Sequence, residues 1–182
     1  MEVIQSEIPG LLILQPKVFK DDRGYFLESF NEKKFTSLTG LAVTFCQDNE
    51  SLSNKGTLRG LHFQKPPFSQ GKLVRVTKGR VLDVAVDIRK KSPFYGHYHM
   101  IELSEENKTQ FWIPAGFAHG FLALEDNTIF NYKCTNYYAP EYEDCIKWND
   151  VTLGIKWPDI SPFVSEKDKK GKDFVNFVSE FE

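Results

Sequence analysis

Short runs of strand-forming residues, separated by turn residues at regular spacing, occupy most of this 182-residue chain. About ten such runs lie between Leu11 and Tyr138, and Asp, Asn and Gly residues stand between them. Helical signals are few: one run begins after Asn31 and ends at Gly40, and another begins at Ser165. Aromatic residues make up 14% of the chain, which favours sheets over helical bundles. We therefore predict an all-β sandwich or barrel with a few short helices.

The bulk properties exclude several partners. No linker-like stretch divides the chain, so we predict one domain over residues 1–182. The formal net charge of −2 gives no global field for nucleic acid. No apolar run approaches the ~20 residues of a membrane span, and the N-terminus lacks the features of a signal peptide. Cys46, Cys134 and Cys145 are odd in number and lack CxxC spacing, which indicates a reducing compartment. We expect a cytoplasmic protein with neither nucleic-acid nor membrane partners.

The stretch 57–76 places charges inside an otherwise apolar strand pattern, which is costly unless the charges have a role. Strict alternation puts Arg59 and His62 on opposite faces. Gly60 lies between them, and a glycine within a strand often marks a bulge, which would turn both side chains toward one cavity. With Lys72, they would form a pocket that binds an anion and moves a proton. The alternative is a half-buried structural histidine with two surface cations.

Two further polar features lie on predicted strands. We predict a strand over 43–49 and a polar loop over 51–54. Gln47, Asp48 and Asn49 stand at the end of this strand, where they either bind hydroxyls and amides or simply form a turn. The run 81–88 alternates, so that Asp83 lies on a face of small and acidic residues.

The spacing Pro114-x-Gly-x-x-His119 resembles the second sequence motif of the cupins, which are jelly-roll barrels. In such a barrel, alternating side chains line a conical cavity. We therefore expect a cupin-type jelly-roll barrel, with His119 delivered to its cavity by a tight turn.

Cupins commonly hold a metal with a His-x-His pair and a glutamate, and His97, His99 and Glu102 look like that set. The spacing argues against it, because Glu102 has the opposite strand parity to the two histidines. The glycines that flank the metal-binding version are also missing. We expect no metal and no cofactor. A metal-dependent cupin oxygenase stays open as a rival, and bound Fe or Mn would be its mark.

Without a metal, the remaining polar residues describe acid–base chemistry. His62 or His119, held by a carboxylate, is a candidate general base. Tyr132, in a long aromatic strand, is a candidate general acid, and Lys72 can stabilise an oxyanion. With arginines for a phosphate, this set indicates proton abstraction next to a carbonyl on a phosphorylated substrate.

Six motifs in order give the chain a specific resemblance. Nearly the whole chain, up to Ser165-Glu-Lys-Asp168, resembles the dTDP-4-dehydrorhamnose 3,5-epimerases, a family of metal-free cupins; residues 155–164 are the least similar. The motifs are Asp22-Arg-Gly-Tyr-Phe-Leu-Glu28, Gln47-Asp-Asn49, Leu58-Arg-Gly-Leu-His-Phe-Gln64, Gly71-Lys-Leu-Val74, Trp112-Ile-Pro-Ala-Gly-Phe-Ala-His-Gly-Phe121 and Tyr132-Lys-Cys-Thr-Asn-Tyr-Tyr138.

The resemblance implies roles for individual residues. His62 would be the base, oriented by Asp168, Tyr132 would be the acid on the opposite face of the sugar, and Lys72 would stabilise the C4 enolate. The expected substrate shell is His119 with Asp83 as its partner, Arg23, Glu28, Gln47, Asp48, Asn49 and Arg59 around the nucleotide and diphosphate, Tyr138 stacked on thymine, and Glu143 and Lys167.

The family resemblance also implies a homodimer with an exchanged strand, in which residues between Arg23 and Glu28 act across the interface. The implied reaction is cofactor-free epimerisation at C3 and C5 of dTDP-4-dehydro-6-deoxy-D-glucose, on the route to dTDP-L-rhamnose. An enzyme that inverts only C3 and a non-catalytic sugar-nucleotide binder stay open as rivals. Product NMR separates the first rival, and solvent exchange separates the second.

Overall fold

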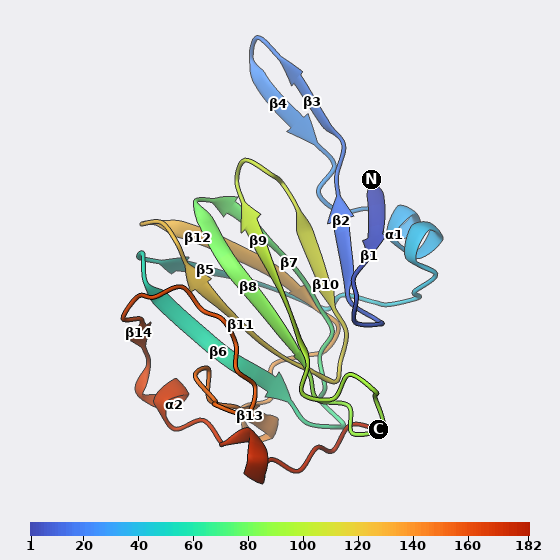
Figure 1. Cartoon of the computed structure of the whole chain (residues 1–182). Helices are drawn as coiled ribbons and strands as arrows, with labels where there is room; N and C mark the ends of the chain where they lie inside the picture. The colour runs from blue at the N-terminus through green and yellow to red at the C-terminus, as the bar shows by residue number, and fades with distance from the viewer.

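The computed structural model describes residues Met1–Glu182 and consists mainly of two facing β-sheets (Figure 1). The first has the strand order β1-β2-β10-β7-β12-β5, and the second has β13-β6-β11-β8-β9 with β14 beside β6. The all-β prediction is confirmed. The strands are β1 (Glu2–Gln5), β2 (Leu12–Gln15), β3 (Val18–Asp21), β4 (Gly24–Leu27), β5 (Gln47–Ser53), β6 (Thr57–Gln64), β7 (Lys72–Lys78), β8 (Arg80–Asp87), β9 (Tyr98–Ser104), β10 (Gln110–Ile113), β11 (Phe117–Ala123), β12 (Thr128–Cys134), β13 (Glu143–Cys145) and β14 (Phe163–Val164).

The main core lies between the sheets and follows from strand alternation. Val81 and Ala85 of β8 point inward and pack with Phe111 and Phe130 of the first sheet. The alternate residues Val84 and Val86 point to the outer face, where they pack in a second apolar cluster, so both faces of this strand bury apolar side chains. A strand buried on both faces requires cover from outside the sandwich.

Each outer face has its own cover. Helix α1 (Glu32–Thr39) covers the first sheet by burying Phe35 against Leu14, Leu73 and Trp112. As predicted, the helix starts at Asn31, whose side chain accepts the Lys34 N–H at 3.1 Å, and ends at Gly40.

The C-terminal segment covers the second sheet with Phe174, Phe177 and Phe181. This segment includes helix α2 (Glu166–Lys169) and a 3₁₀ turn at Phe174–Asn176; a second such turn spans Pro140–Tyr142. Neither α-helix has the length and apolar character that crossing a membrane requires.

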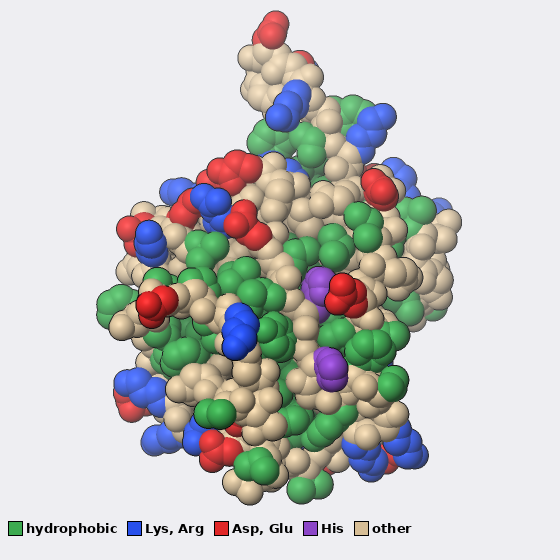
Figure 2. All heavy atoms as spheres, in the orientation of Figure 1, with side chains coloured by type: hydrophobic (Ala, Val, Ile, Leu, Met, Phe, Trp, Pro, Cys, Tyr) green, Lys and Arg blue, Asp and Glu red, His purple; other side chains and the backbone are tan.

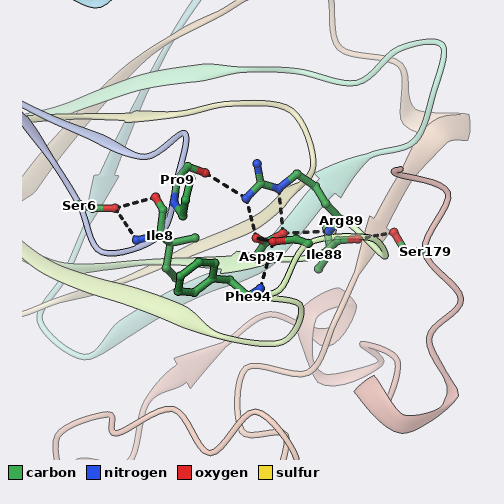
Figure 3. Close-up of polar contacts among 9 residues, drawn as sticks. Ser6, Ile8, Pro9, Asp87, Ile88, Arg89, Phe94 and Ser179 are labelled. Atoms are coloured by element: carbon green, nitrogen blue, oxygen red, sulfur yellow. Dashed lines mark hydrogen bonds and ion pairs between the residues drawn. The ribbon is translucent and has the colours of Figure 1, made fainter.

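A buried polar cluster ties the two chain ends to β8 (Figure 3). The fully buried Asp87 carboxylate accepts hydrogen bonds from the Arg89 guanidinium at 2.6 and 2.9 Å and from Ser92 Oγ at 2.7 Å. Arg89 also donates to the Pro9 carbonyl at 3.0 Å, and Ser179 Oγ donates to the Ile88 carbonyl. The N-terminal loop and the C-terminal segment are thereby fixed to the same end of the sandwich.

The hairpin β3–β4 stands clear of the sandwich (Figures 1 and 2). Its strands pair only with each other. It carries exposed aromatic side chains at Phe19, Tyr25 and Phe26, the last 68% exposed. An isolated two-stranded ribbon is marginally stable in water, so the exposed aromatic side chains of this hairpin form a surface that is available for contact with another molecule.

One part of the sequence prediction was wrong. The spacing favours a strand over 43–49 and a polar loop over 51–54, but β5 begins at Gln47 and continues through Ser53. Each β5 residue pairs with β12, for example Ser51 with Phe130. Tertiary pairing thus overrides the weak strand propensity of polar residues.

The predicted irregularity at Gly60 is confirmed. In the pairing of β6 with β11, His62 is opposite His119 and Arg59 is opposite Phe121, so β6 contains one extra residue between these pairs. Gly60 has φ +124°, and a Cβ atom there would lie 2.6 Å from Gly120 Cα. The bulge therefore requires glycine at this position.

We expect Gly60→Ala to destabilise the fold by about 3–5 kcal/mol, because it combines backbone strain with a backbone clash. Gly24→Ala is the matched control: Gly24 has φ +129° but nothing within 4 Å of its added Cβ, so only the strain of about 1–2 kcal/mol applies. Urea unfolding of both variants measures the difference. Equal losses would contradict the clash at Gly60.

Candidate active site

A cavity of about 550 Å³ opens between the two sheets. Its walls carry most of the polar residues that the sequence singled out, contributed by both sheets and by the C-terminal segment. These are Gln47, Asn49, Arg59, His62, Lys72, His119, Tyr132, Tyr138, Glu143, Lys167 and Asp168. The bulge at Gly60 explains why Arg59 and His62 both line the cavity, since strict alternation would place their side chains on opposite faces of β6.

His62 and Asp168 form a close pair. His62 Nε2 lies 2.5 Å from Asp168 Oδ1; the Asp168 side chain is 4% exposed and that of His62 is 28% exposed. The Gly60 N–H also donates to Asp168, at 3.4 Å, and Ser165 caps the short helix that carries it. Burial raises the pKa of Asp168, but the hydrogen bond and charge of His62 outweigh burial, so the pKa is lowered overall. The ionised carboxylate thus holds the imidazole ring in place.

Lys72 and Tyr132 face the pair from the opposite sheet, on the adjacent strands β7 and β12. Lys72 Nζ lies 5.8 Å from the centre of the Tyr132 ring. Burial lowers the pKa of Lys72, and burial together with the neighbouring Cys134 raises that of Tyr132. Tyr132 therefore keeps its proton at neutral pH.

His119 has its own carboxylate. His119 Nε2 lies 2.9 Å from Asp83 Oδ2, and both residues are buried. The His119 ring also stacks over Phe130. The cavity therefore contains a second His–Asp pair, beside the first one in the β6–β11 register.

A third group lies at the cavity wall near the C-terminal segment. Tyr138 donates a 2.6 Å hydrogen bond to Glu143, which also pairs with Lys167. Burial raises the Glu143 pKa, but Lys167 and Tyr138 outweigh it, so the pKa falls overall. Arg59 is held by Ser53 Oγ and the Leu52 carbonyl, each at 3.2 Å. Two cations and an exposed aromatic ring suit an anionic aromatic ligand.

Four predicted site residues do not line this cavity. Asp83 is fully buried and reaches it only through its contact with His119. Asp48 lies on the other face of β5 and pairs with Lys133 at 3.0 Å. Glu28 pairs with Lys34 at 2.7 Å. Arg23 lies on the projecting hairpin, where its side chain is 89% exposed and pairs with Asp21.

The residues of the metal-site alternative do not cluster. Glu102 pairs with Arg80 at 3.6 Å, whereas His99 packs beside Phe111 and His97 beside Phe94. The one group of potential metal ligands in the structure lies elsewhere, at His62, Asp168 and Cys145.

Two site residues were missed by sequence reasoning. The Ser51 hydroxyl lines the cavity and has no hydrogen-bond partner. Cys145 pairs with His62 across β13 and β6, and burial raises its thiol pKa to about 12. Ser51 falls in the stretch predicted as a loop, and Cys145 falls in the irregular region beyond Pro140, where no periodicity indicated which way it faces.

Comparisons with known proteins agree on one family. A sequence profile described as dTDP-4-dehydrorhamnose 3,5-epimerase matches residues 5–176. A relative with that name from Shigella flexneri is 53% identical over 176 residues, 97% of each chain. The crystal structure of the enzyme from Elizabethkingia anophelis has a TM-score of 0.91 and 48% identity, over 96% of this chain and 97% of that one. A Legionella pneumophila dTDP-6-deoxy-D-glucose-3,5-epimerase in complex with dTDP-4-keto-L-rhamnose has a TM-score of 0.91 and 49% identity, over 93% and 90%.

We expect the stabilising effect of Asp168 to depend on pH. Because its pKa is lowered in the folded state, its contribution is present above the unfolded value near 4 and is lost as pH falls through the folded value. Asp168→Asn should therefore destabilise the protein by about 1–3 kcal/mol at pH 6 and by less at pH 3. Denaturant unfolding at several pH values measures this. Asp159→Asn, at an exposed position, is the control. If the loss of unfolding free energy in Asp168→Asn grew toward low pH, that result would contradict the pairing of Asp168 with His62.

Proposed function

Because the chain belongs to the dTDP-4-dehydrorhamnose 3,5-epimerase family, it inverts C3 and C5 of dTDP-4-dehydro-6-deoxy-D-glucose, and we propose that the cavity between the sheets is its active site. One observation carries the proposal: a carboxylate-held imidazole lies on one sheet and a phenol and an ammonium lie on the facing sheet. A sugar ring bound between the sheets has the base on one side and the acid on the other.

His62 is the proposed base. A proton next to a ketone is far less acidic than imidazolium, whose reference pKa is ~6.5, and each unit of mismatch costs ~1.4 kcal/mol. Asp168 reduces this cost by stabilising the imidazolium that forms. Lys72 reduces it further, because its ammonium meets the negative charge that develops on the C4 oxygen in the transition state.

Tyr132 is the proposed acid. Inversion requires a proton to return from the face opposite to the one it left. Tyr132 lies on the sheet facing His62, and its raised pKa keeps the phenol protonated. C3 and C5 both flank the C4 ketone, so one base and one acid serve both inversions through an enolate. The reaction needs no cofactor.

The remaining residues of the cavity bind the substrate. Arg59 and Lys167 attract the diphosphate, and Tyr138 stacks on the thymine ring at the cavity wall. Gln47 and Asn49 are linked to each other by a 3.0 Å hydrogen bond and present amides to the nucleotide. His119, held by Asp83, and Glu143 shape the sugar site. Asp48 is not part of this set, because its side chain faces away from the cavity and pairs with Lys133.

We further propose a cytoplasmic homodimer in which residues 1–182 form one catalytic domain. The hairpin β3–β4 supports the dimer, because it exposes Phe19, Tyr25 and Phe26 and pairs with no other strand of its own chain. Arg23 and Glu28 then reach the nucleotide and diphosphate of the partner's substrate. The three cysteines are free, which suits a reducing compartment.

Removal of the base and removal of the acid should give different results in D₂O. His62→Ala should lower epimerisation and deuterium entry at C3 and C5 by about 10²–10⁴-fold. Tyr132→Phe should lower inversion similarly but still allow deuterium to enter, since His62 remains. Product NMR measures both quantities.

Tyr137→Phe is the matched control, because Tyr137 is exposed and does not line the cavity. If His62→Ala exchanged deuterium at the wild-type rate, the assignment of the base would be wrong.

The proposed exchange of Arg23 between subunits can be tested by mixing two impaired variants. In a heterodimer of Arg23→Ala and His62→Ala subunits, one site receives an intact His62 and an intact Arg23 from the partner. Random reassembly should therefore recover about a quarter of the wild-type activity. No recovery after verified subunit exchange would show that Arg23 acts in its own subunit or not at all.

A further inference from the structure

Cys145 lies against the catalytic pair, although the proposed reaction does not use it. The thiol belongs to β13, whose register places Cys145 opposite His62. The imidazole nitrogen of His62, the sulfur of Cys145 and a carboxylate oxygen of Asp168 all lie within 4.8 Å of one another. Cys145 and Asp168 are buried, and His62 is half-buried.

We propose that His62, Cys145 and Asp168 form a binding site for a thiophilic divalent cation of the Zn²⁺ type, and that the bound cation inhibits epimerisation. The inhibitory half rests on the proposed function, because it requires His62 to be the base. The binding half rests only on the three ligands.

The ligand set is one that Zn²⁺ prefers. Imidazole nitrogen, thiolate and carboxylate bind it at about 2.0–2.3 Å in tetrahedral geometry, with neighbouring ligand atoms roughly 3.5 Å apart. His62 and Asp168 are now 2.5 Å apart, so they must separate by about 1 Å. Asp168 is carried by a four-residue helix, α2, next to a two-residue strand, β14, so this movement involves few backbone pairs. His62 and Asp168 both line the cavity, so a water molecule from the cavity can supply the fourth ligand.

The charges of the site determine which cation it accepts. The Cys145 thiol loses its proton to solvent when it binds a metal, and the thiolate and the Asp168 carboxylate then balance the two positive charges of the ion. Lys72 and Arg59 line the same cavity and repel cations. A hard cation such as Mg²⁺ gains little from a thiolate and meets the same repulsion, so the site selects soft cations.

Occupancy and catalysis are mutually exclusive at His62. The nitrogen that shares a proton with Asp168 becomes the metal ligand, and the imidazole can no longer accept a proton from the sugar. The site thus inhibits epimerisation to a degree that depends on the concentration of free Zn²⁺.

Co²⁺, as a spectroscopic substitute for Zn²⁺, tests binding without reference to activity. We expect a thiolate-to-cobalt charge-transfer band on titration of the wild type, absent in Cys145→Ser and in Cys145→Ala. Cys46→Ser is the matched control and should keep the band, because Cys46 is not part of the cluster. Circular dichroism verifies that each variant is folded.

Epimerisation with added Zn²⁺ tests inhibition, each variant being normalised to its own rate in chelator. Cys145→Ser should need at least about tenfold more Zn²⁺ for half inhibition than the wild type, and Mg²⁺ should not inhibit. Absence of the band, or equal bands in wild type and Cys145→Ser, would overturn the site. A Cys145-dependent band with undiminished epimerisation would support the ligand set and contradict the role of His62 as base, so the two failures are distinguishable.

Discussion

The contact between His62 and Asp168 is the interaction on which the site depends. A carboxylate as deeply buried as Asp168 is costly unless it is paired, and here its partners are an imidazole and the Gly60 N–H. The same contact joins β6 of the second sheet to the C-terminal segment. The contact that orients the proposed base is therefore also part of what holds the segment against the sheet.

The two-sheet architecture suits a reaction that removes and returns a proton. A single wall offers functional groups to only one face of a sugar. The sandwich offers two facing walls, and its strands place an imidazole on one wall and a phenol with an ammonium on the other. The bulge at Gly60 refines this placement, because without the extra residue Arg59 and His62 would face opposite sides of β6.

Rules that depend only on nearby residues, such as helix capping and strand alternation, predicted the local features of this protein well. Asn31 and Gly40 define helix α1, alternation along 81–88 places Asp83 on the same face as Val81 and Ala85, and Gly60 indicates the bulge. Long-range features were less accessible. The start of β5 depends on pairing with β12, some 80 residues away, and the direction of Cys145 depends on a register that an irregular segment does not reveal. The family resemblance supplied Asp168 as the partner of His62, which no periodicity could have done.

The C-terminal segment contributes both a hydrophobic cover and the carboxylate that pairs with His62. Phe174, Phe177 and Phe181 shield the outer face of the second sheet, and Asp168, a few residues earlier, aligns the imidazole. Detachment of the tail, whether by fraying or by proteolytic clipping, would therefore remove the carboxylate partner of His62 at the same moment as it exposes the sheet.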